Sequence, residues 1–301
     1  MTLTCNNKLI DVPGIAVGHK SLGDTGCTVI VVPDSAIAAV DVRGGGPGTR
    51  ETDLLAPHNT VQRVHAITLT GGSAYGLAAA DGVMTRLEED RIGFRVLDTD
   101  ESPIVPIVPA AVIFDLLVGD PTHRPTRDDG YAAAHAALTG EPDTRSGSVG
   151  AGCGATVGRL RGGFGQASMQ VGEWIMAAGI VANPMGDVMN PDTGEFWADP
   201  RRKVAVDKLP AATPKLNTTI GVIATNAPIT KAQAKRLAMV AHDGIARAIH
   251  PAHSPLDGDT LFCLSTGDGT GVDLETMLSL STHAAKITAA AIVDAVVAAE
   301  P

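Results

Sequence analysis

Residues 215–227 read KLNTTIGVIATNA, with two adjacent threonines directly before a short apolar run. The run 219–225 is short, apolar and rich in β-branched residues, which predicts a buried β-strand. Thr218 stands just before it, so its hydroxyl is expected at the end of a sheet, and a role as an ordinary strand residue is the simpler interpretation. The alternative is a nucleophile. If the chain were cut before Thr218, the new α-amine, with a pKa of about 8, could act as the base for the hydroxyl of the same residue.

Other short apolar runs, each bounded by Gly, Pro or Asp, predict further strands. They are 28–33 (TVIVVP), 36–42 (AIAAVDV), 65–70 (HAITLT) and 261–266 (LFCLST). Strands with continuous apolar content need cover on both faces. Because the expected strands outnumber the expected helices, the pattern favours sheets packed on each other with helices outside, in one layered α/β or α+β domain.

Three helices are expected between and after these strands. The first has a buried face formed by Leu77, Ala80, Val83, Met84 and Leu87. The second is predicted to begin near Thr230, which forms a capping-box pattern with Gln233, and to end before Pro251. The Ala-rich stretch 282–299 predicts the third. The polar stretch 194–216 has no clear periodicity and is expected to be an irregular surface segment.

Composition excludes several classes of protein. The chain has 33 Asp and Glu against 23 Lys and Arg, a net charge of −10, and no basic run, so no nucleic-acid partner is expected. The N-terminal sequence MTLTCNNKLIDVPG has no signal-peptide pattern, and no apolar stretch of about 18 residues indicates a membrane span. The scattered cysteines are expected to be reduced thiols, which fits a cytoplasmic protein; they are Cys5, Cys27, Cys153 and Cys263.

No metal or cofactor is predicted. The nine histidines form no H-E-x-x-H pattern, and His250 and His253, in the sequence H-P-A-H, have no nearby cysteine. Capping or solvated polarity is the expected role of that pair. The glycine-rich stretches 43–48, 70–76 and 150–154 lack the dinucleotide fingerprint and the G-K-[ST] of a P-loop. Tight turns and close backbone packing are expected there instead.

An acidic pair precedes the last predicted strand. Residues 256–262 read LDGDTLF, which places Asp257 and Asp259 two apart and therefore on one face of an extended chain. Two such carboxylates repel each other unless a cation lies between them, but D-G-D is also a common turn sequence. The residues alone leave both interpretations open. The ammonium group of an N-terminal Thr218 would be a suitable cation.

Several stretches, taken in order, resemble one family of self-processing enzymes. They are PGIAVGH (13–19), VDVRGGGPGTRETDLL (40–55), LTGGSAYGL (69–77), VGAGCGATVG (149–158), VANPMG (181–186), NTTIGVIATNAP (217–228) and LDGDTLF (256–262). The family is that of L-aminopeptidase/D-esterase, the β-peptidyl aminopeptidases and the nylon-oligomer (6-aminohexanoate-oligomer) hydrolase. The resemblance covers nearly the whole chain and implies a four-layer α/β/β/α sandwich.

The resemblance also implies an inactive precursor that cuts itself between Asn217 and Thr218. The products would be an α-subunit of residues 1–217 and a β-subunit of residues 218–301, which together form one structural domain. Processed αβ pairs would assemble into a homo-oligomer such as a tetramer. The family implies a small peptide or amide as substrate and no cofactor.

Individual roles follow from the same resemblance. Thr218 matches the nucleophile of both self-cleavage and hydrolysis, and Asn183 matches the amide that stabilises the oxyanion. Asp257 and Asp259 match residues that orient the new N-terminus and assist proton movement. The substrate pocket would include Tyr75 and Arg159, although the nylon-oligomer hydrolase has lysine where this chain has Arg159. Arginine stays protonated, so it cannot take over any role of that lysine as a base.

The predicted function is that of an aminopeptidase or amidase on small peptides or amino-acid amides. The Asp pair and the N-T-T sequence resemble the nylon-oligomer hydrolase, because the β-peptidyl aminopeptidases have Ser and Glu for the Asp pair and a Ser nucleophile. An endo-amidase of that type is therefore one alternative. An acyltransferase similar to ornithine acetyltransferase, with its own D-G-D-T segment, is another. A non-enzymatic binding protein that stays uncut is the third.

Overall fold

One long strand, β2 (Gly26–Val42), connects the two halves of the main sheet in the computed structural model, which describes residues 5–99, 101–209 and 217–299. Its first half pairs with β1 (Ala16–Ser21), and its second half pairs with β13 (Thr260–Ser265). Strand β4 (Arg63–Thr70) pairs with both halves, with an irregularity in register between them. β2 therefore belongs to both halves of the sandwich.

The sequence predicted two strands, 28–33 and 36–42, where the structure has the single strand β2. Pro33 suggested a break because it cannot donate to a sheet ladder. The register with β4 shifts between Val31 and Ala36, so no ladder bond is needed from Pro33. Ser35 has a positive φ of 63° at the same place. The bulge thus absorbs the proline and bends the strand without ending it.

The described residues form one nine-stranded sheet and two small hairpins. The order of its main path is β10 (Gly163–Val171), β11 (Trp174–Ala182), β12 (Ile220–Thr225), β13, β2, β4, β7 (Ala110–Val112) and β3 (Thr49–Arg50), with β1 beside β2. The pairs β12–β13 and β4–β7 are parallel, and the other pairs are antiparallel. The hairpins are β5 (Phe94–Arg95) with β6 (Ile104–Val105) and β8 (Thr156–Val157) with β9 (Leu160–Arg161).

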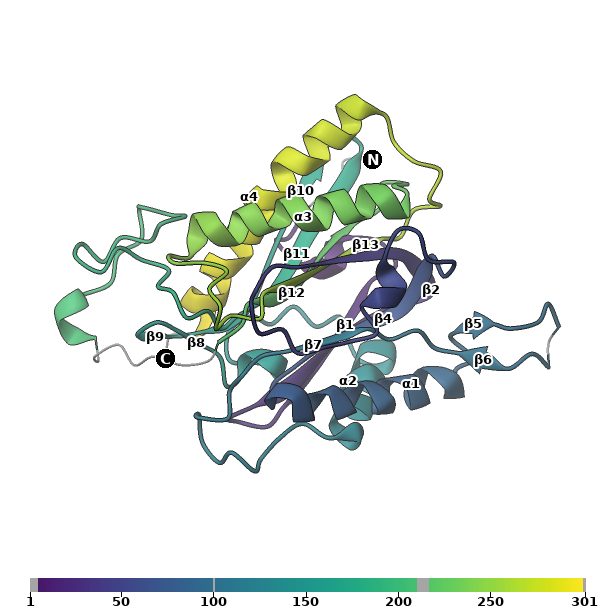
Figure 1. Ribbon diagram of the computed structural model, residues 1–301, viewed down its shortest axis with the longest axis horizontal. Helices are drawn as coiled ribbons and strands as arrows, with labels where there is room; N and C mark the ends of the chain where they lie inside the picture. The colour runs from purple at the N-terminus through teal and green to yellow at the C-terminus, as the bar shows by residue number, and fades with distance from the viewer. Residues whose placement is uncertain (1–4, 100, 210–216, 300–301) are drawn as a thin grey trace.

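Helices cover the two outer faces. On one side lie α1 (Ala79–Glu89) and α2 (Arg127–Thr139), and on the opposite side lie α3 (Lys231–Ala248) and α4 (Leu274–Ala299) (Figure 1). The β5–β6 hairpin extends away from the body beside α1 (Figure 1). Short 3₁₀ helices occupy the connections: η1 (Leu9–Asp11), η2 (Asp53–Leu55), η3 (Ser73–Ala78), η4 (Gly150–Gly152) and η5 (Val206–Lys208).

Three separate hydrophobic cores show that the molecule has four layers. The side chains of β2 alternate between them, as the pleat requires. In the first half of β2, Val29 and Val31 pack toward α1 and α2, whereas Ile30 belongs to the middle core. In the second half, Ile37 and Ala39 pack toward α3 and α4. The predicted α/β/β/α sandwich is confirmed.

Most of the helix positions predicted from the sequence agree with the structure. The capping box at the start of α3 is formed, because Gln233 N donates to Thr230 Oγ1 at 3.2 Å and Thr230 N donates to Gln233 Oε1 at 3.0 Å. Helix α4 begins at Leu274, earlier than predicted. Helix α2 was missed, because its contact with α1 is made largely by small residues such as Gly130, which packs on the backbone of Ala79. Of the irregular stretch 194–216, the part 210–216 lies outside the described residues.

Helix α4 corrects the expectation that no stretch has the character of a membrane span. It is long enough, with a mean hydropathy of 1.3 over an 18-residue window, of which 56% is buried inside the protein. Its contacts are with α3, β10 and β11. A helix of this composition packed in this way is a core helix.

Gly165 provides a test of how closely α4 approaches the sheet. A Cβ at this position of β10 would collide with the backbone of Ala291 and Ala295 in α4. We expect Gly165→Ala to lower the free energy of unfolding by about 1–3 kcal/mol through overpacking, measured by urea denaturation. Gly172 has open space around it and a φ of 62°, so Gly172→Asn is the control and should change little. Equal stability of both variants would contradict this packing.

Candidate active site

Four strand ends meet where the sequence placed its candidate residues. Asn183 directly follows β11, and Thr218 stands just before β12, which pairs antiparallel with β11. Asp259 directly precedes β13, which runs parallel to β12. Arg43 follows β2, whose last residue pairs with the first residue of β13. The topology therefore brings segments distant in sequence to one edge of the sheet.

The peptide between Asn217 and Thr218 is held tightly at this edge. Thr218 is 5% exposed, and its hydroxyl donates to the carbonyl oxygen of Asn217 at 2.5 Å. Its backbone N–H donates to the carbonyl oxygen of Asn183 at 2.7 Å. The side-chain amide of Asn217 donates to Pro184 O at 2.6 Å. The hydroxyl is thus fixed beside the carbonyl group of the preceding residue.

The carboxylate of Asp259 connects the start of β12 to a nearby loop. Its Oδ1 accepts from the backbone N–H of Thr219 at 2.7 Å. Its Oδ2 accepts from the ring Nδ1 of His253 at 2.7 Å and from the backbone N–H of His253 at 3.2 Å. The side chain of Asp259 is almost fully buried. This carboxylate therefore holds the residue that follows Thr218.

Asp257 has separate backbone partners. Its Oδ1 accepts from Met185 N at 3.1 Å, and its Oδ2 accepts from Ser254 N at 2.9 Å. Its backbone forms an isolated parallel bridge with Asn217. The two carboxylates are thus bound by backbone N–H groups and His253, which offset the cost of burying them.

The glycine-rich loop after β2 packs against this acidic loop. A Cβ on Gly44 would collide with the backbone of Asp257 and Asp259. Gly46 N donates to Asp257 O at 2.8 Å. In the acidic loop, a Cβ on Gly258 would lie 2.7 Å from Gly46 O and 2.9 Å from Thr218 Oγ1. The predicted close backbone packing is present at the 43–48 stretch.

The side chain of Asn183 connects the edge that holds Thr218 to two other segments. Its Oδ1 accepts from Thr156 N at 2.9 Å, and its Nδ2 donates to Phe114 O at 3.1 Å. Thr156 begins the β8–β9 hairpin, and Arg159 lies in the turn of that hairpin. Arg159 is partly buried, and its Nη2 has no hydrogen-bond partner among the described residues. The hairpin places Arg159 close in sequence to a residue that contacts Asn183.

Tyr75 lies on η3, where it is 63% exposed and is covered by the guanidinium of Arg124 at 3.9 Å from the ring centre. The glycine loop before η3 is fixed by Asp115, whose Oδ1 accepts from Gly72 N at 2.7 Å. Burial raises the pKa of Asp115 above its usual value. Asp115 follows Phe114, the residue bonded to the Asn183 amide. This loop therefore connects the segment that carries Tyr75 to the side chain of Asn183.

A second polar cluster lies behind His253. The ring of His242 meets the ring of His253 edge to face, with centres 5.0 Å apart. His242 Nε2 lies 3.0 Å from Asp41 O, and Asp41 pairs with Lys235 at 2.6 Å. His242 is fully buried, and desolvation lowers its pKa to about 4. His242 is therefore neutral near pH 7.

The sequence reasoning missed the position of His253. The H-P-A-H stretch was interpreted as capping or solvated polarity, and this is wrong for His253, which pairs with Asp259 and whose side chain is 20% exposed. The available signal was the short distance in sequence between His253 and the acidic pair. The conformation of the loop could not be inferred from this signal, because it depends on the positive φ of 56° at His253.

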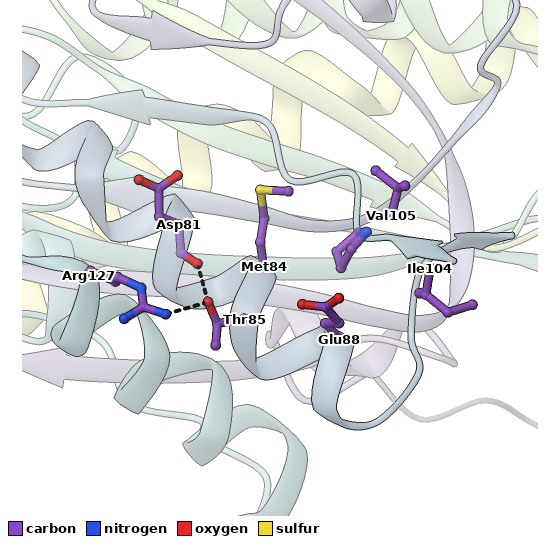
Figure 2. Close-up of a pocket in the computed structure, with 8 residues that line it drawn as sticks. Asp81, Met84, Thr85, Glu88, Ile104, Val105 and Arg127 are labelled. Carbon is purple, nitrogen blue, oxygen red and sulfur yellow. Dashed lines mark hydrogen bonds between the residues drawn. The ribbon is translucent and has the colours of Figure 1, made fainter. Parts of the chain in front are cut away.

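Two surface cavities lie away from this edge, and Thr218 lines neither. One of about 460 Å³ lies between α1 and β6 and is lined by Asp81, Met84, Glu88 and Arg127 among others (Figure 2). Another of about 810 Å³ lies beside α4 and includes Trp197. Within the described ranges, no group of three or more His, Cys, Asp or Glu side chains is arranged to hold a metal ion.

Solved structures define the class of this fold. An L-aminopeptidase D-Ala-esterase/amidase of Ochrobactrum anthropi, described as a new variant among the Ntn hydrolase fold, matches with a TM-score of 0.78 and 21% identity, covering 98% of this chain and 86% of that one. A β-aminopeptidase of a Burkholderia species matches with a TM-score of 0.75 and 26% identity, covering 97% and 86%. The chain therefore shares the fold of these two structures.

Residues 7–301 match Peptidase family S58, and the chain belongs to this family. An uncharacterized aminopeptidase of Mycobacterium tuberculosis is 48% identical, covering 87% of this chain and 82% of the relative. A 6-aminohexanoate-oligomer endohydrolase of Paenarthrobacter ureafaciens is 33% identical, covering 88% and 76%. The chain is therefore a hydrolase of peptide or amide bonds, as its sequence motifs predicted.

The pKa of His242 predicts an acid sensitivity of the folded chain. Unfolding returns His242 to a pKa of about 6.5, so the unfolded state binds more protons between that value and about 4. Stability should fall as the pH drops through this window, with His242 contributing a slope of about 1.4 kcal/mol per pH unit. Urea denaturation from pH 7 to 4 should show a shallower slope for His242→Gln. The exposed His58 provides the control variant, His58→Gln. An unchanged slope in His242→Gln would contradict the assignment of this acid sensitivity to His242.

Proposed function

We propose that the chain is a self-cleaving N-terminal threonine hydrolase that is cut between Asn217 and Thr218. The observation that carries this proposal is the hydroxyl of Thr218, 2.5 Å from the carbonyl oxygen of Asn217 and 5% exposed. The backbone nitrogen of the same bond is fixed on Asn183 O at 2.7 Å. A nucleophile and its carbonyl held together in this way resemble a bound substrate before attack.

The cut proceeds by transfer of the Asn217 acyl group from nitrogen to oxygen. Thr218 Oγ1 attacks the carbonyl carbon of Asn217, the C–N bond breaks, and the proton of the hydroxyl passes to the departing nitrogen. The resulting ester joins Asn217 to the Thr218 oxygen. Water then hydrolyses this ester, which leaves a carboxyl group on Asn217 and restores the hydroxyl of Thr218 beside a free α-amine.

In turnover, that α-amine takes the proton from Thr218 Oγ1 as the hydroxyl attacks a substrate amide. The leaving amine of the substrate receives the proton, and water hydrolyses the acyl ester. Asn183 supports both steps: its backbone carbonyl accepts from the Thr218 nitrogen, and its Nδ2 carries a second N–H besides the one given to Phe114 O. That second N–H is our proposed donor to the oxyanion.

Asp259 and Asp257 act as positioning residues in this proposal. Asp259 holds the backbone of Thr219, directly after the nucleophile. Asp257 holds the backbone of Met185, in the segment that follows Asn183. In the cut chain both carboxylates are placed to balance the charge of a protonated α-amine.

We propose small peptides or amino-acid amides as substrates, with Tyr75 and Arg159 in the pocket. The M. tuberculosis relative is named an aminopeptidase, which favours this class. An endo-amidase on longer oligomers is the second candidate, favoured by the P. ureafaciens relative. The Nη2 of Arg159 has no hydrogen-bond partner within the described part of the chain, so it is suited to binding a polar group of the substrate.

We further propose that processed αβ pairs form a homo-oligomer, with a tetramer as the expected size. Exposed apolar side chains on and beside the β5–β6 hairpin offer contact area; they are Phe94, Val96, Leu97 and Val105. The free thiols at positions 5, 27, 153 and 263 favour the cytoplasm as the compartment.

Replacement of the nucleophile tests the proposal directly. Intact mass under denaturing conditions should show the wild-type chain as two fragments of 217 and 84 residues, following from a cut after Asn217 in a chain of 301. Thr218→Ala has no hydroxyl and should remain one full-length species without amidase activity. Thr218→Ser, which keeps a hydroxyl, should still be cut. A Thr218→Ala chain that cuts itself and hydrolyses amides would exclude the mechanism.

Gly258 tests whether the position of the hydroxyl matters. The added methyl group of Gly258→Ala would lie 2.9 Å from Thr218 Oγ1 and 2.7 Å from Gly46 O, so the hydroxyl must move. We expect self-cleavage to slow by roughly 10–100-fold, followed by the loss of full-length chain over time. The matched control is Gly46→Ala in the facing loop. The nearest atom that the added Cβ of Gly46 would meet outside its chain neighbours, within the described residues, is Asp257 O at 3.8 Å. Similar self-cleavage rates for both variants would show that the contact between residue 258 and the Thr218 hydroxyl does not control the cut.

A further inference from the structure

We propose that His253 is a positioning residue that holds the new N-terminus in place after the cut, through Asp259 and Thr219. This inference rests on the proposed function for its catalytic consequence. The contact chain itself is directly visible in the uncut protein. It runs from His253 Nδ1 to Asp259 Oδ2 at 2.7 Å, and from Asp259 Oδ1 to Thr219 N at 2.7 Å.

The cut changes what holds Thr218. In the intact chain, Thr218 is restrained by covalent bonds on both sides. After the cut, the bond to Asn217 is gone, and the restraints that remain near the nucleophile are its hydrogen bond to Asn183 O and the contacts of Thr219. Thr219 O accepts from Thr260 N at 3.0 Å, and Thr219 N donates to Asp259. The carboxylate of Asp259 therefore becomes a main anchor of the terminal residue.

His253 determines where that carboxylate lies. A carboxylate group can rotate about its Cβ–Cγ bond, and a donor on the second oxygen fixes this rotation. His253 supplies two donors to Oδ2, its ring Nδ1 at 2.7 Å and its backbone N–H at 3.2 Å. Because carboxylate oxygens accept, the ring carries its proton on Nδ1. The ring bond is the shorter of the two and the one that a substitution can remove.

His253 is itself held in an unusual conformation. Its φ of 56° lies in the left-handed region, which only a few per cent of residues other than glycine occupy. Its ring packs edge to face against His242, which is fully buried and bonded toward Asp41 O at 3.0 Å. The loop thus places a histidine where glycine or asparagine would be less strained. The loop conformation and the packing on His242 thus hold the ring against Asp259.

Three substitutions separate the ring from the backbone conformation. His253→Gly keeps the positive φ and the backbone N–H but loses the ring donor. His253→Asn also suits the positive φ and keeps a side-chain N–H at the position of Nδ1. The control is His123→Ala, which removes a histidine that is paired with Asp24 at the same distance of 2.7 Å on another loop.

The first measurement needs no catalysis. In the Thr218→Ala background, which stays intact, the hydrogen-exchange rate of the Thr219 amide is measured by NMR. We expect His253→Gly to raise it about tenfold or more, the size expected for one hydrogen bond involving a charged group. His253→Asn and His123→Ala should stay within about threefold of the parent. An unchanged rate in His253→Gly overturns the proposal, whether or not the chain is an N-terminal threonine hydrolase.

The second measurement compares cutting with turnover in the otherwise natural chain. Self-cleavage should change less than about threefold in His253→Gly, because Thr218 is still held on both sides, whereas kcat should fall about tenfold or more with KM little changed. His253→Asn should restore kcat, which a loss through misfolding would not allow. Equal losses in cleavage and kcat, or no rescue by Asn, overturn the catalytic part of the inference. A wild-type chain that never cuts, together with fast Thr219 exchange in His253→Gly, contradicts the proposed function and supports the positioning role.

Discussion

The peptide between Asn217 and Thr218 lies where backbone hydrogen bonds from neighbouring strands leave it little freedom. The nitrogen of Thr218 is bonded to Asn183 O and its hydroxyl to Asn217 O. A buried polar group without a partner costs free energy, so each of these bonds constrains its neighbours. The acidic loop, the glycine loop after β2 and the segment after β11 all approach this one peptide. The hydrogen bonds that this peptide requires therefore determine the distances between these three segments.

Close approach of these loops depends on small residues. The chain has 34 glycines and few aromatics, and many of the described glycines stand where two backbones meet. Gly44 packs on the backbone of the acidic loop, and Gly165 packs on α4. A sandwich built from small residues brings its layers close together, and β2 can then serve both halves of the sheet. The same composition explains why hydrophobic periodicity was a weak guide to α2.

The sequence predicted what depends on local pattern. The strand after Thr218 and the capping box at Thr230 follow from side-chain type and spacing within a few residues. Thr218 and Asp259 could be singled out because each precedes a strand. The contact of His253 with Asp259 depends on a left-handed residue in a loop, and the partners of Asn183 come from segments far away in the chain. The first contact is signalled only by the short distance in sequence between the two residues, and the second carries no local signal.

The burial of Thr218 fits an enzyme that is made inactive. In the uncut chain the residue has no free amine, so the base that our mechanism requires does not exist yet. Its hydroxyl is occupied by Asn217 O, and the residue is 5% exposed, so no external amide could reach it. In our proposal, breaking the Asn217–Thr218 bond changes these conditions together, because it frees the amine and releases the hydroxyl from Asn217 O. The packing that protects the peptide is thus also the packing that positions it for attack.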